Sequence, residues 1–214
     1  KGIGKLEKSS AVNGAAALAG WKCSIPIEAM DKDPWLLACA NGTLDLRSGC
    51  LRPSDRADLL TRAVPHAYDE DARCPRWELF LSEVMEEDPD RVALLHRFFG
   101  YCLTAETREH KLLMLVGRGS NGKSNVVETL MHVLGPDFAC QAPEGLLLIQ
   151  RGEKHPTELM KLKDKRLVVA SEMPESSMFS EARLKSLTGG DTITARGMRQ
   201  DFVDFRPSHK MVIS

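Results

Sequence analysis

The sequence predicts an α/β fold with a parallel-type central sheet in its second half, preceded by a mostly helical region. Three observations predict this fold. Two apolar runs, "KLLMLVG" and "RLVVAS", are continuous rather than alternating, as in strands that are covered on both faces. The segments around them have the apolar spacing of helices. The chain has 214 residues, which is enough for one large domain or two small ones.

Helical patterns and one hairpin fill the first half. "SAVNGAAALAGWK" favours a helix that Gly14 and Gly20 weaken. "NGTLDLRSGCLRP" has two short alternating runs around a turn containing Gly49, which predicts a β-hairpin. Because proline suits the first turn of a helix, Pro75 and Pro89 predict two further helix starts. The apolar faces of those two helices would be Trp77, Phe80, Leu81 and Val84, and then Val92, Leu95, Phe98, Phe99 and Cys102.

Strands and helices alternate in the second half. "KLLMLVG" predicts a strand buried on both faces. The helix Lys123–Leu134 follows, and Gly135 with Pro136 ends it. A second buried strand is expected at Arg166–Ser171.

Three shorter elements complete the chain. Ser180–Leu187 reads as a short helix, "DTITARGMRQDFVDF" as a hairpin with Gly197 near its tip, and "HKMVIS" as a final strand. The change of pattern near residue 105 predicts two domains. Residues 1–105 would form a mostly helical domain with a small hairpin, and residues 106–214 an α/β core.

Composition limits the class of protein. The formal net charge is -1, which neither favours nor excludes a nucleic-acid partner. Six cysteines lack both the spacing of a zinc site and a histidine cluster, so we expect reduced thiols in a cytosolic protein. No apolar run approaches membrane-spanning length and no signal peptide is visible, so we expect no membrane partner. The sequence begins at Lys1 without methionine, so we expect a piece of a longer protein.

A glycine-rich loop supplies the clearest chemical signal. Gly117 to Ser124 fits the pattern G-x-x-x-x-G-K-S between a predicted strand and a predicted helix. In such a loop, successive backbone N–H groups converge on phosphate oxygens at the positive end of the helix. Lys123 would reach the β- and γ-phosphates, and Ser124 would bind Mg²⁺. The residues expected to surround ATP and Mg²⁺ are Gly117, Gly119, Ser120, Asn121, Gly122, Lys123, Ser124 and Asn125.

An acidic residue follows the second buried strand. Glu172 comes directly after "RLVVAS", and a carboxylate there can orient an attacking water or hold the hydration shell of a metal. Ser171 occupies the place where many ATPases have a second acid. We therefore expect Glu172 to be a catalytic residue and, with Ser124, a metal ligand.

The second predicted hairpin is basic. Residues 183–210 contain six Lys or Arg and three Asp. A basic hairpin with a glycine near its tip can contact a phosphate backbone. On charge alone, a hairpin that is merely exposed to solvent is an equally good interpretation, because runs of charge commonly lie on exposed faces.

Taken together and in order, these segments resemble the superfamily 3 helicases. "GRGSNGKS", "HPTELMKLKDKRLVVASE", "LKSLTGGDTITAR" and "HKMVIS" are most similar to the phage and plasmid primase-helicases, which are related to the poxvirus primase-helicase. "NGTLDLRSG", "YDEDARCPRWELFLSEV" and "RFFGYCLT" resemble the domain that precedes the ATPase in that group. The resemblance runs from about Asp33 to the end. It implies an AAA+-like P-loop NTPase core.

The resemblance also implies roles for single residues. Lys123 and Ser124 match the Walker A motif, and Glu172 matches Walker B. Lys185–Arg199 matches the family's extra motif, which carries a DNA-contacting hairpin. Within it, Arg196 and Arg199 are expected to contact phosphates, and Lys185 is a weaker DNA-binding candidate that could instead reach a neighbouring subunit's nucleotide.

The function implied is an ATP-dependent DNA helicase of a phage- or plasmid-type replication protein. A homo-oligomeric ring, expected to be a hexamer, would couple ATP hydrolysis between subunits to translocation on single-stranded DNA. A primase domain is expected upstream, and the protein would work in the cytoplasm of a bacterial host. The sensor residue, the arginine finger and a fifth strand beside the loop strand are expected beyond Ser214, so this piece should bind nucleotide but hydrolyse it poorly.

Two other functions remain open from the residues alone. A small-molecule P-loop kinase would need an acceptor pocket and an arginine-rich lid, and "LTGGDTITAR" is not such a pattern. A nucleotide-gated assembly module would bind ATP and form a ring without unwinding DNA, and the single acid at Glu172 is compatible with it.

Overall fold

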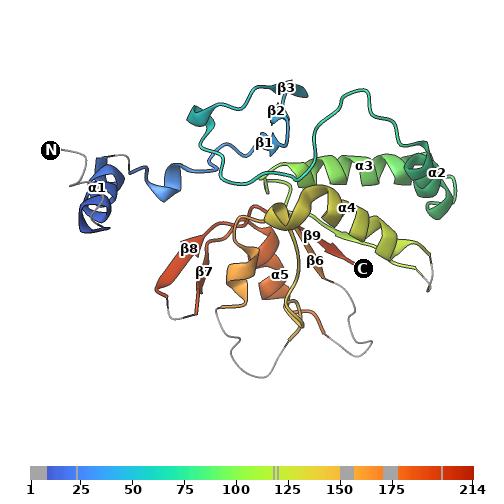
Figure 1. The fold of residues 1–214 in the computed structure, drawn as a ribbon. Coiled ribbons are helices and arrows are strands. Elements are labelled where there is room, and N and C mark those ends of the chain that lie inside the picture. The colour runs from blue at the N-terminus through green and yellow to red at the C-terminus, as the bar shows by residue number, and fades with distance from the viewer. Residues whose placement is uncertain are drawn as a thin grey trace.

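A four-stranded parallel sheet forms the centre of the molecule (Figure 1). The computed structural model describes residues 9–22, 24–117, 119, 121–149, 157–170, 178–198 and 200–214. The strands are β4 (Leu112–Met114), β5 (Ala139–Gln141), β6 (Leu167–Ala170) and β9 (Lys210–Ile213), in the spatial order β4-β9-β6-β5. All three pairings are parallel, so the predicted α/β fold with a parallel sheet is confirmed.

Both faces of this sheet are covered, because its central strands alternate their side chains between two cores. Leu167, Val169 and Val212 point into one core, while Val168 and Met211 point into the other. All five are fully buried. This explains the continuous apolar runs that predicted these strands.

The first strand of the sheet differs from its prediction. β4 was expected to be buried on both faces, but it lies at the edge and pairs only with β9. Its three residues are only partly buried or exposed, and Met114 is 48% exposed. An edge strand has a neighbouring strand on one side only, and an apolar run alone does not show that a strand will lie at an edge of the sheet.

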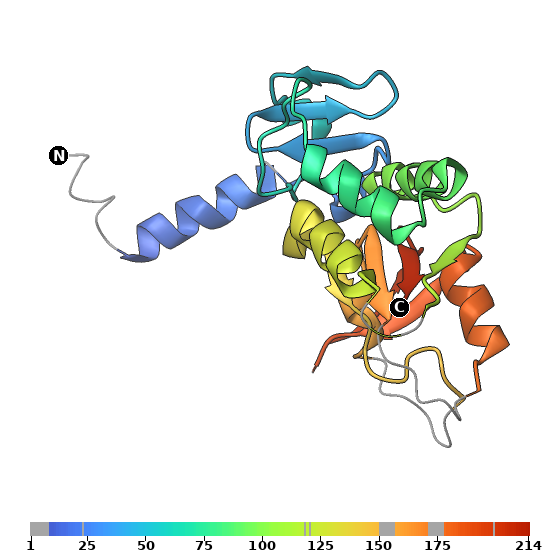
Figure 2. The same cartoon turned by 90° about the vertical axis from the view of Figure 1, so that its right-hand side faces the viewer.

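One face of the sheet carries α4 and the amino-terminal elements (Figure 2). Helix α4 spans Lys123–Phe138, and its backbone leaves the helical conformation at Gly135, where φ is 69°. The predicted stop at Gly135 and Pro136 is therefore confirmed, with one more turn following it. A side chain at position 135 would meet Pro65, since an ideal Cβ there would lie 2.6 Å from the Pro65 Cδ.

Two helices pack beside α4. Helix α2 (Pro75–Val84) and helix α3 (Pro89–Leu103) both begin at the prolines that predicted them. The carboxylate of Asp88 caps α3 by accepting hydrogen bonds from the backbone N–H groups of residues 90 and 91. Leu81 from α2 and Leu95 from α3 meet Val126 of α4 in a small core of their own.

A three-stranded antiparallel sheet lies above these helices (Figure 2). The predicted hairpin is present as β2 (Gly42–Asp45) and β3 (Cys50–Arg52), and β1 (Leu36–Cys39) pairs with β2 as a third strand. Short 3₁₀ turns stand at Ile27–Ala29 and Arg56–Asp58. β1 was not predicted, although the pair Asn41-Gly42 at the turn before β2 is a common hairpin signal.

The opposite face of the parallel sheet carries the remaining elements. They are a 3₁₀ turn (Leu159–Leu162), α5 (Glu181–Thr188) and the antiparallel hairpin of β7 (Ile193–Arg196) and β8 (Phe202–Phe205). The predicted helix and hairpin are both confirmed. Leu187 of α5 is buried in the core on this side of the sheet.

Helix α1 (Ser9–Lys22) stands away from the rest of the molecule (Figures 1 and 2). The helix that "SAVNGAAALAGWK" predicted is thus confirmed. The side chains of residues 10–21 are all exposed, including Trp21 at 88%. None of the helices in the described part of the chain has both the length and the apolar character needed to span a bilayer.

The predicted boundary near residue 105 crosses a continuous core. The largest hydrophobic cluster contains Leu37 and Phe98 from before that point together with Val127, Val169 and Val212 from after it. The two halves therefore pack as neighbouring layers, and the division at residue 105 stays a prediction from the sequence.

Candidate functional site

The candidate site lies at the carboxyl edge of the parallel sheet. Because β4, β6 and β9 are parallel, the segments that follow them all leave from this edge. β9 lies between the other two, and its last hydrogen bonds tie the strand ends together. The N–H of Leu115 donates to the carbonyl of Ile213 at 2.8 Å, and that of Ser214 donates to the carbonyl of Ala170 at 3.1 Å. Ligands of open parallel sheets commonly bind at this edge.

The glycine-rich loop joins β4 to α4 at this edge. Gly122 adopts a left-handed conformation, with φ 82° and ψ 0°, and is the residue immediately before α4. It provides no side-chain cap for the helix. The first N–H groups of α4 therefore have no side-chain acceptor at Gly122, and such groups are a favourable site for an anion.

Helix α2 packs closely against the loop. An ideal Cβ at Gly122 would lie 2.8 Å from Cγ1 of Val84 and 3.0 Å from Cε2 of Phe80. The absence of a side chain at Gly122 therefore allows the loop to approach α2. Gly117 is also close to a neighbour, because a Cβ there would lie only 1.7 Å from Nδ2 of Asn121.

The Lys123 side chain folds back over the loop. Its ammonium group donates to the carbonyl of Gly117 at 3.0 Å and to Oδ1 of Asn121 at 2.8 Å. Three loop residues are therefore joined by one cation. A phosphate that binds in the loop would compete with these two acceptors for the same ammonium group.

A cavity of about 750 Å³ opens beside the loop, and we call it the loop cavity. Its loop side is formed by Gly117, Gly119, Asn121, Gly122 and Lys123. Its other walls come from the end of α2, the start of α3 and the edge strand β4. The volume is within the range of sites that hold a small ligand. The structure thus brings five of the predicted nucleotide residues together around one cavity.

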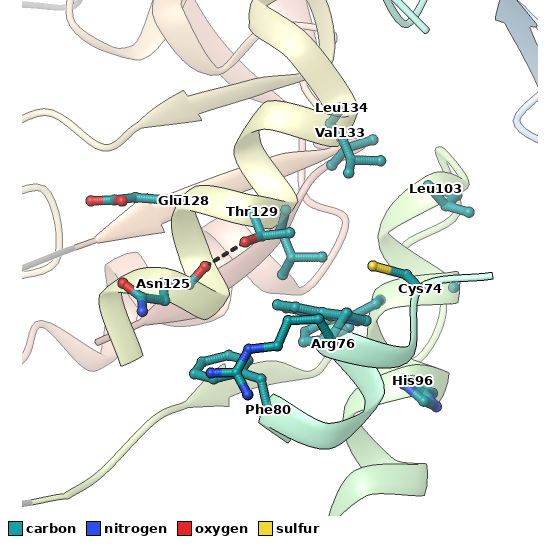
Figure 3. A pocket seen from close by; sticks show the side chains of 14 residues that line it. Cys74, Arg76, Phe80, His96, Leu103, Asn125, Glu128, Thr129, Val133 and Leu134 are labelled. Carbon is teal, nitrogen blue, oxygen red and sulfur yellow. Dashed lines mark hydrogen bonds between the residues drawn. The ribbon is translucent and has the colours of Figure 1, made fainter. Parts of the chain in front are cut away.

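A second cavity of about 880 Å³ lies between α2, α3 and α4, and we call it the α2–α4 groove (Figure 3). Asn125 was predicted with the loop residues, but its side chain lines this groove and not the loop cavity. Most of the lining is apolar, with Trp77 and Phe80 forming a tilted ring pair whose centroids are 5.5 Å apart. Thr129 donates to the carbonyl of Asn125 at 2.7 Å, as the dashed line shows.

Several predicted site residues lie elsewhere or outside the described ranges. Ser120, Glu172 and Arg199 are outside them, so the expected catalytic and metal-binding role of Glu172 stays a prediction. Ser124 is exposed in the first turn of α4. In the described part of the chain, no three His, Cys, Asp or Glu side chains gather closely enough to hold a metal ion.

Two of the predicted DNA-binding residues, Lys185 and Arg196, are on the other side of the sheet. Lys185 lies on α5, where its ammonium group is 3.8 Å from a carboxylate oxygen of Glu181, one turn earlier. Arg196 ends β7 and faces Phe202 across the hairpin, with its guanidinium 5.2 Å from the ring centroid. Neither Lys185 nor Arg196 lines the loop cavity or the α2–α4 groove.

Two groups of residues near these sites were missed from the sequence. The ring pair Trp77 and Phe80 was assigned to a core face, although it also lines the α2–α4 groove. Phe202, 62% exposed, was not singled out at all. The available signal was its place in an alternating strand, since positions 202 and 204 share a face with the polar partners of β7.

The fold and the site together define a class of protein. It is an α/β protein in which a glycine-rich loop leads from an edge strand of a parallel sheet into a helix, with a lysine at the start of that helix. Two family models match consecutive parts of the chain. Residues 3–86 match the model described as "D5 N terminal like", and residues 115–214 match the "Family of unknown function (DUF5906)".

Similar proteins come from several viruses. A protein of Acanthamoeba polyphaga mimivirus named "Putative helicase" is 27% identical over 188 residues, which are 85% of this chain and 19% of the relative. A "Putative helicase" of Invertebrate iridescent virus 3 is 24% identical over 229 residues, 99% of this chain and 24% of the relative. A "Putative primase" of African swine fever virus is 27% identical over 197 residues, 87% of this chain and 20% of the relative.

A solved structure shares the fold. The apo C-terminal region of NrS-1 superposes with a TM-score of 0.52 at 16% identity, over 64% of this chain and 31% of that one. The family matches and the viral relatives agree with the similarity to primase-helicases that the sequence indicated, and the solved structure shares the fold. The chain is thus similar in sequence to viral proteins named as helicases and primases. It spans about a fifth to a quarter of the length of the curated relatives it matches.

Proposed function

We propose that this chain is the nucleotide-binding part of a DNA replication helicase of superfamily 3, which uses ATP with Mg²⁺. The observation that carries the proposal is the loop Gly117–Ser124 at the carboxyl edge of a parallel sheet, with Lys123 folded across it. The names of the viral relatives, helicases and primases, support a role in replication. Because this chain spans only about a fifth to a quarter of the length of those relatives, helicase activity is proposed for the whole protein and not for this chain alone.

The loop residues have separate tasks in this proposal. The backbone N–H groups at the start of α4 bind phosphate oxygens, since Gly122 supplies no competing side-chain cap. Lys123 exchanges the carbonyl of Gly117 and the amide oxygen of Asn121 for phosphate oxygens, which are stronger acceptors because they are charged. Ser124 would hold Mg²⁺, and Glu172 would orient the attacking water.

Nucleotide chemistry would drive movement on DNA. The hairpin β7–β8, which carries Arg196, is the proposed contact with single-stranded DNA. Arg199 is a further candidate for phosphate contact from the sequence, and Lys185 is a weaker one. Several copies of the protein would form a ring, proposed as a hexamer, with ATP between subunits. A primase domain in the same polypeptide, a phage or plasmid origin and work in the cytoplasm of a bacterial host complete the proposal.

The test is ATP hydrolysis by the full-length protein that contains this chain, with and without single-stranded DNA. We expect DNA to stimulate hydrolysis and Lys123→Ala to abolish it. Measurable ATP hydrolysis that single-stranded DNA does not stimulate would contradict the helicase function and favour a kinase or an assembly module. A Glu172→Ala protein that kept all activities would favour the assembly module.

A further inference from the structure

The α2–α4 groove and the glycine-rich loop share a wall. The ring of Phe80 lines the groove, and two of its atoms, Cε2 and Cζ, come within 3.0 Å of the place where Gly122 would carry a Cβ. Val84, one turn later in α2, lines the loop cavity and touches the same glycine. Gly122 is therefore next to one residue from the lining of each cavity, Phe80 from the groove and Val84 from the loop cavity.

Helix α4 connects the two cavities as well. Lys123 faces the loop cavity, and Asn125, two residues later in the first turn, faces the α2–α4 groove. In Figure 3 the side chains of Arg76 and Phe80 extend from α2 toward the end of α4 that carries Asn125. A ligand whose phosphates bind at the start of α4 would therefore have to extend only along this first turn to place a further group in the groove.

The two cavities differ in chemistry. Among its described lining residues the loop cavity has no aromatic ring, and it is lined by aliphatic side chains together with Glu86, Arg91 and Lys123. The α2–α4 groove has the Trp77–Phe80 ring pair, the apolar side chains of Leu130 and Val133, and an amide at Asn125. The loop cavity suits phosphates, whereas the groove suits a flat aromatic group with polar edges.

We propose that the α2–α4 groove holds the purine base of the nucleotide whose phosphates bind at Gly117–Ser124. This inference rests on the proposed function and assigns the half of the nucleotide that the loop does not bind. The faces of the base contact Trp77 and Phe80, and the Asn125 amide pairs with its edge, because an amide both donates and accepts hydrogen bonds. Arg76 also lines the groove; its side chain is 76% exposed, and its guanidinium lies 3.8 Å from a carboxylate oxygen of Glu83.

The test separates base from phosphates by comparing two probes, ATP and inorganic tripolyphosphate, on the full-length protein. Tripolyphosphate has the phosphate chain without ribose or base. In Asn125→Ala, an exposed position on the surface of α4, we expect about tenfold weaker ATP binding, the scale of one lost hydrogen-bonded pair. The affinity for tripolyphosphate should stay within about twofold. Trp77→Leu should show the same selective loss.

Two control variants distinguish the groove from the loop. Leu79→Ser changes an exposed residue of α2 that lines neither cavity and should leave ATP binding unchanged. Lys123→Ala should weaken both probes. The base site is overturned if Asn125→Ala and Trp77→Leu lower the affinities for ATP and tripolyphosphate equally, or if Leu79→Ser, outside the groove, shows the same selective loss of ATP binding. If the wild-type protein bound neither probe, the proposed function would fail and the base site with it.

A spectroscopic signal provides a second readout. ATP should change the fluorescence of Trp77, since the base would lie against its indole, whereas tripolyphosphate should not. Trp77→Phe keeps a ring in the groove, so this variant should retain ATP binding and lose the fluorescence change. An ATP-induced change that persists in Trp77→Phe would mean that the base lies elsewhere.

Discussion

Gly122 is the loop residue whose lack of a side chain matters most to the structure. Its φ of 82° is a conformation that side chains with a Cβ adopt only at a cost, and Val84 and Phe80 occupy the adjacent space. Gly119 lies in the same loop, but an added Cβ there would meet nothing within 4 Å. Backbone conformation and packing therefore favour glycine at position 122, whereas the space around position 119 would admit a side chain.

We predict that Gly122→Ala lowers the free energy of unfolding by about 1 to 3 kcal/mol, from backbone strain and the contacts with α2. Gly119→Ala, the matched control, should change it by less than about 0.5 kcal/mol. Urea denaturation followed by tryptophan fluorescence measures both. Equal effects of the two substitutions would show that the approach of α2 to the loop does not depend on Gly122.

Lys210 is a buried cation that joins the sheet to the end of α3. Its ammonium group donates to the carbonyls of Thr104, Glu106 and Ser208, and it lies 4.7 Å from the ring centroid of Tyr101. Burial lowers the pKa of Lys210 from 10.5 to about 7, with the nearby charge of Arg166 acting in the same direction. An unfolded chain would therefore bind a proton at Lys210 more tightly than the folded one does.

This difference fixes the sign of a pH effect. Between pH 7 and 10.5 the unfolded state binds more protons at Lys210, so the free energy of unfolding should rise with pH in that window. The slope from one group is at most about 1.4 kcal/mol per pH unit. We expect wild-type stability to rise from pH 7 to 8.5 and Lys210→Met to remove that part of the slope. Urea titrations at each pH provide the test, and parallel curves for the two proteins would contradict it.

The β7–β8 hairpin has two faces of different character. Ile193, Ala195 and Phe205 are buried against the sheet, whereas Arg196 and Phe202 pair on the outer face. An exposed aromatic ring beside a guanidinium is a surface on which the bases of single strands can stack. This pairing gives Arg196 a neighbour that the count of charges in the sequence could not indicate.

For the hairpin we predict that Phe202→Ala weakens binding of single-stranded DNA by about 1 to 3 kcal/mol, the range for loss of one stacked base. The salt dependence of binding should stay the same, since no charge is lost. Arg196→Gln should instead reduce the dependence on salt. Fluorescence anisotropy with a labelled oligonucleotide over a series of salt concentrations measures both. Phe202→Tyr, which keeps the ring, is the control and should bind as wild type does.

Elements with strong local patterns could be predicted, and their neighbours in space could not. The starts of α2 and α3 follow from prolines, and the end of α4 follows from Gly135. The order of the strands has no such local signal: β9 comes last in the chain and yet lies at the centre of the sheet, beside β4. That order decides which strand is at the edge, which is why the burial of β4 was predicted wrongly.

At the scale of the whole molecule, one part of the candidate site could be predicted from the sequence and another part could not. Local sequence is sufficient to predict a loop that carries Lys123 at the start of a helix. The wall of the α2–α4 groove comes from Trp77 and Phe80, more than forty residues earlier, and these read as ordinary core positions in their own helix. Only packing of α2 against Gly122 brings them to the loop, and no pattern within either segment encodes that contact.

Arg166 binds the two halves of the chain together in the largest core. Its guanidinium donates to the carbonyls of Leu103 and Leu36, the latter at 2.7 Å, and lies 4.6 Å from the ring centroid of Phe138. Burial lowers the pKa of Arg166 to about 10. Two carbonyls from before residue 105, one buried and one partly buried, therefore depend on one residue from after it, in addition to the shared apolar contacts.

A shared core of this kind predicts that the chain unfolds in one cooperative step. All three tryptophans, at 21, 35 and 77, report on the first half, whereas far-UV circular dichroism reports on the whole chain. In urea the two signals should follow one coincident transition. Arg166→Met should shift both midpoints together, by about 1 to 3 kcal/mol, because it leaves buried carbonyls without a donor. A fluorescence transition that separates from the circular dichroism transition in the wild-type protein would show instead that residues 1–105 unfold as an independent domain, which is the arrangement that the change of sequence pattern near residue 105 suggested.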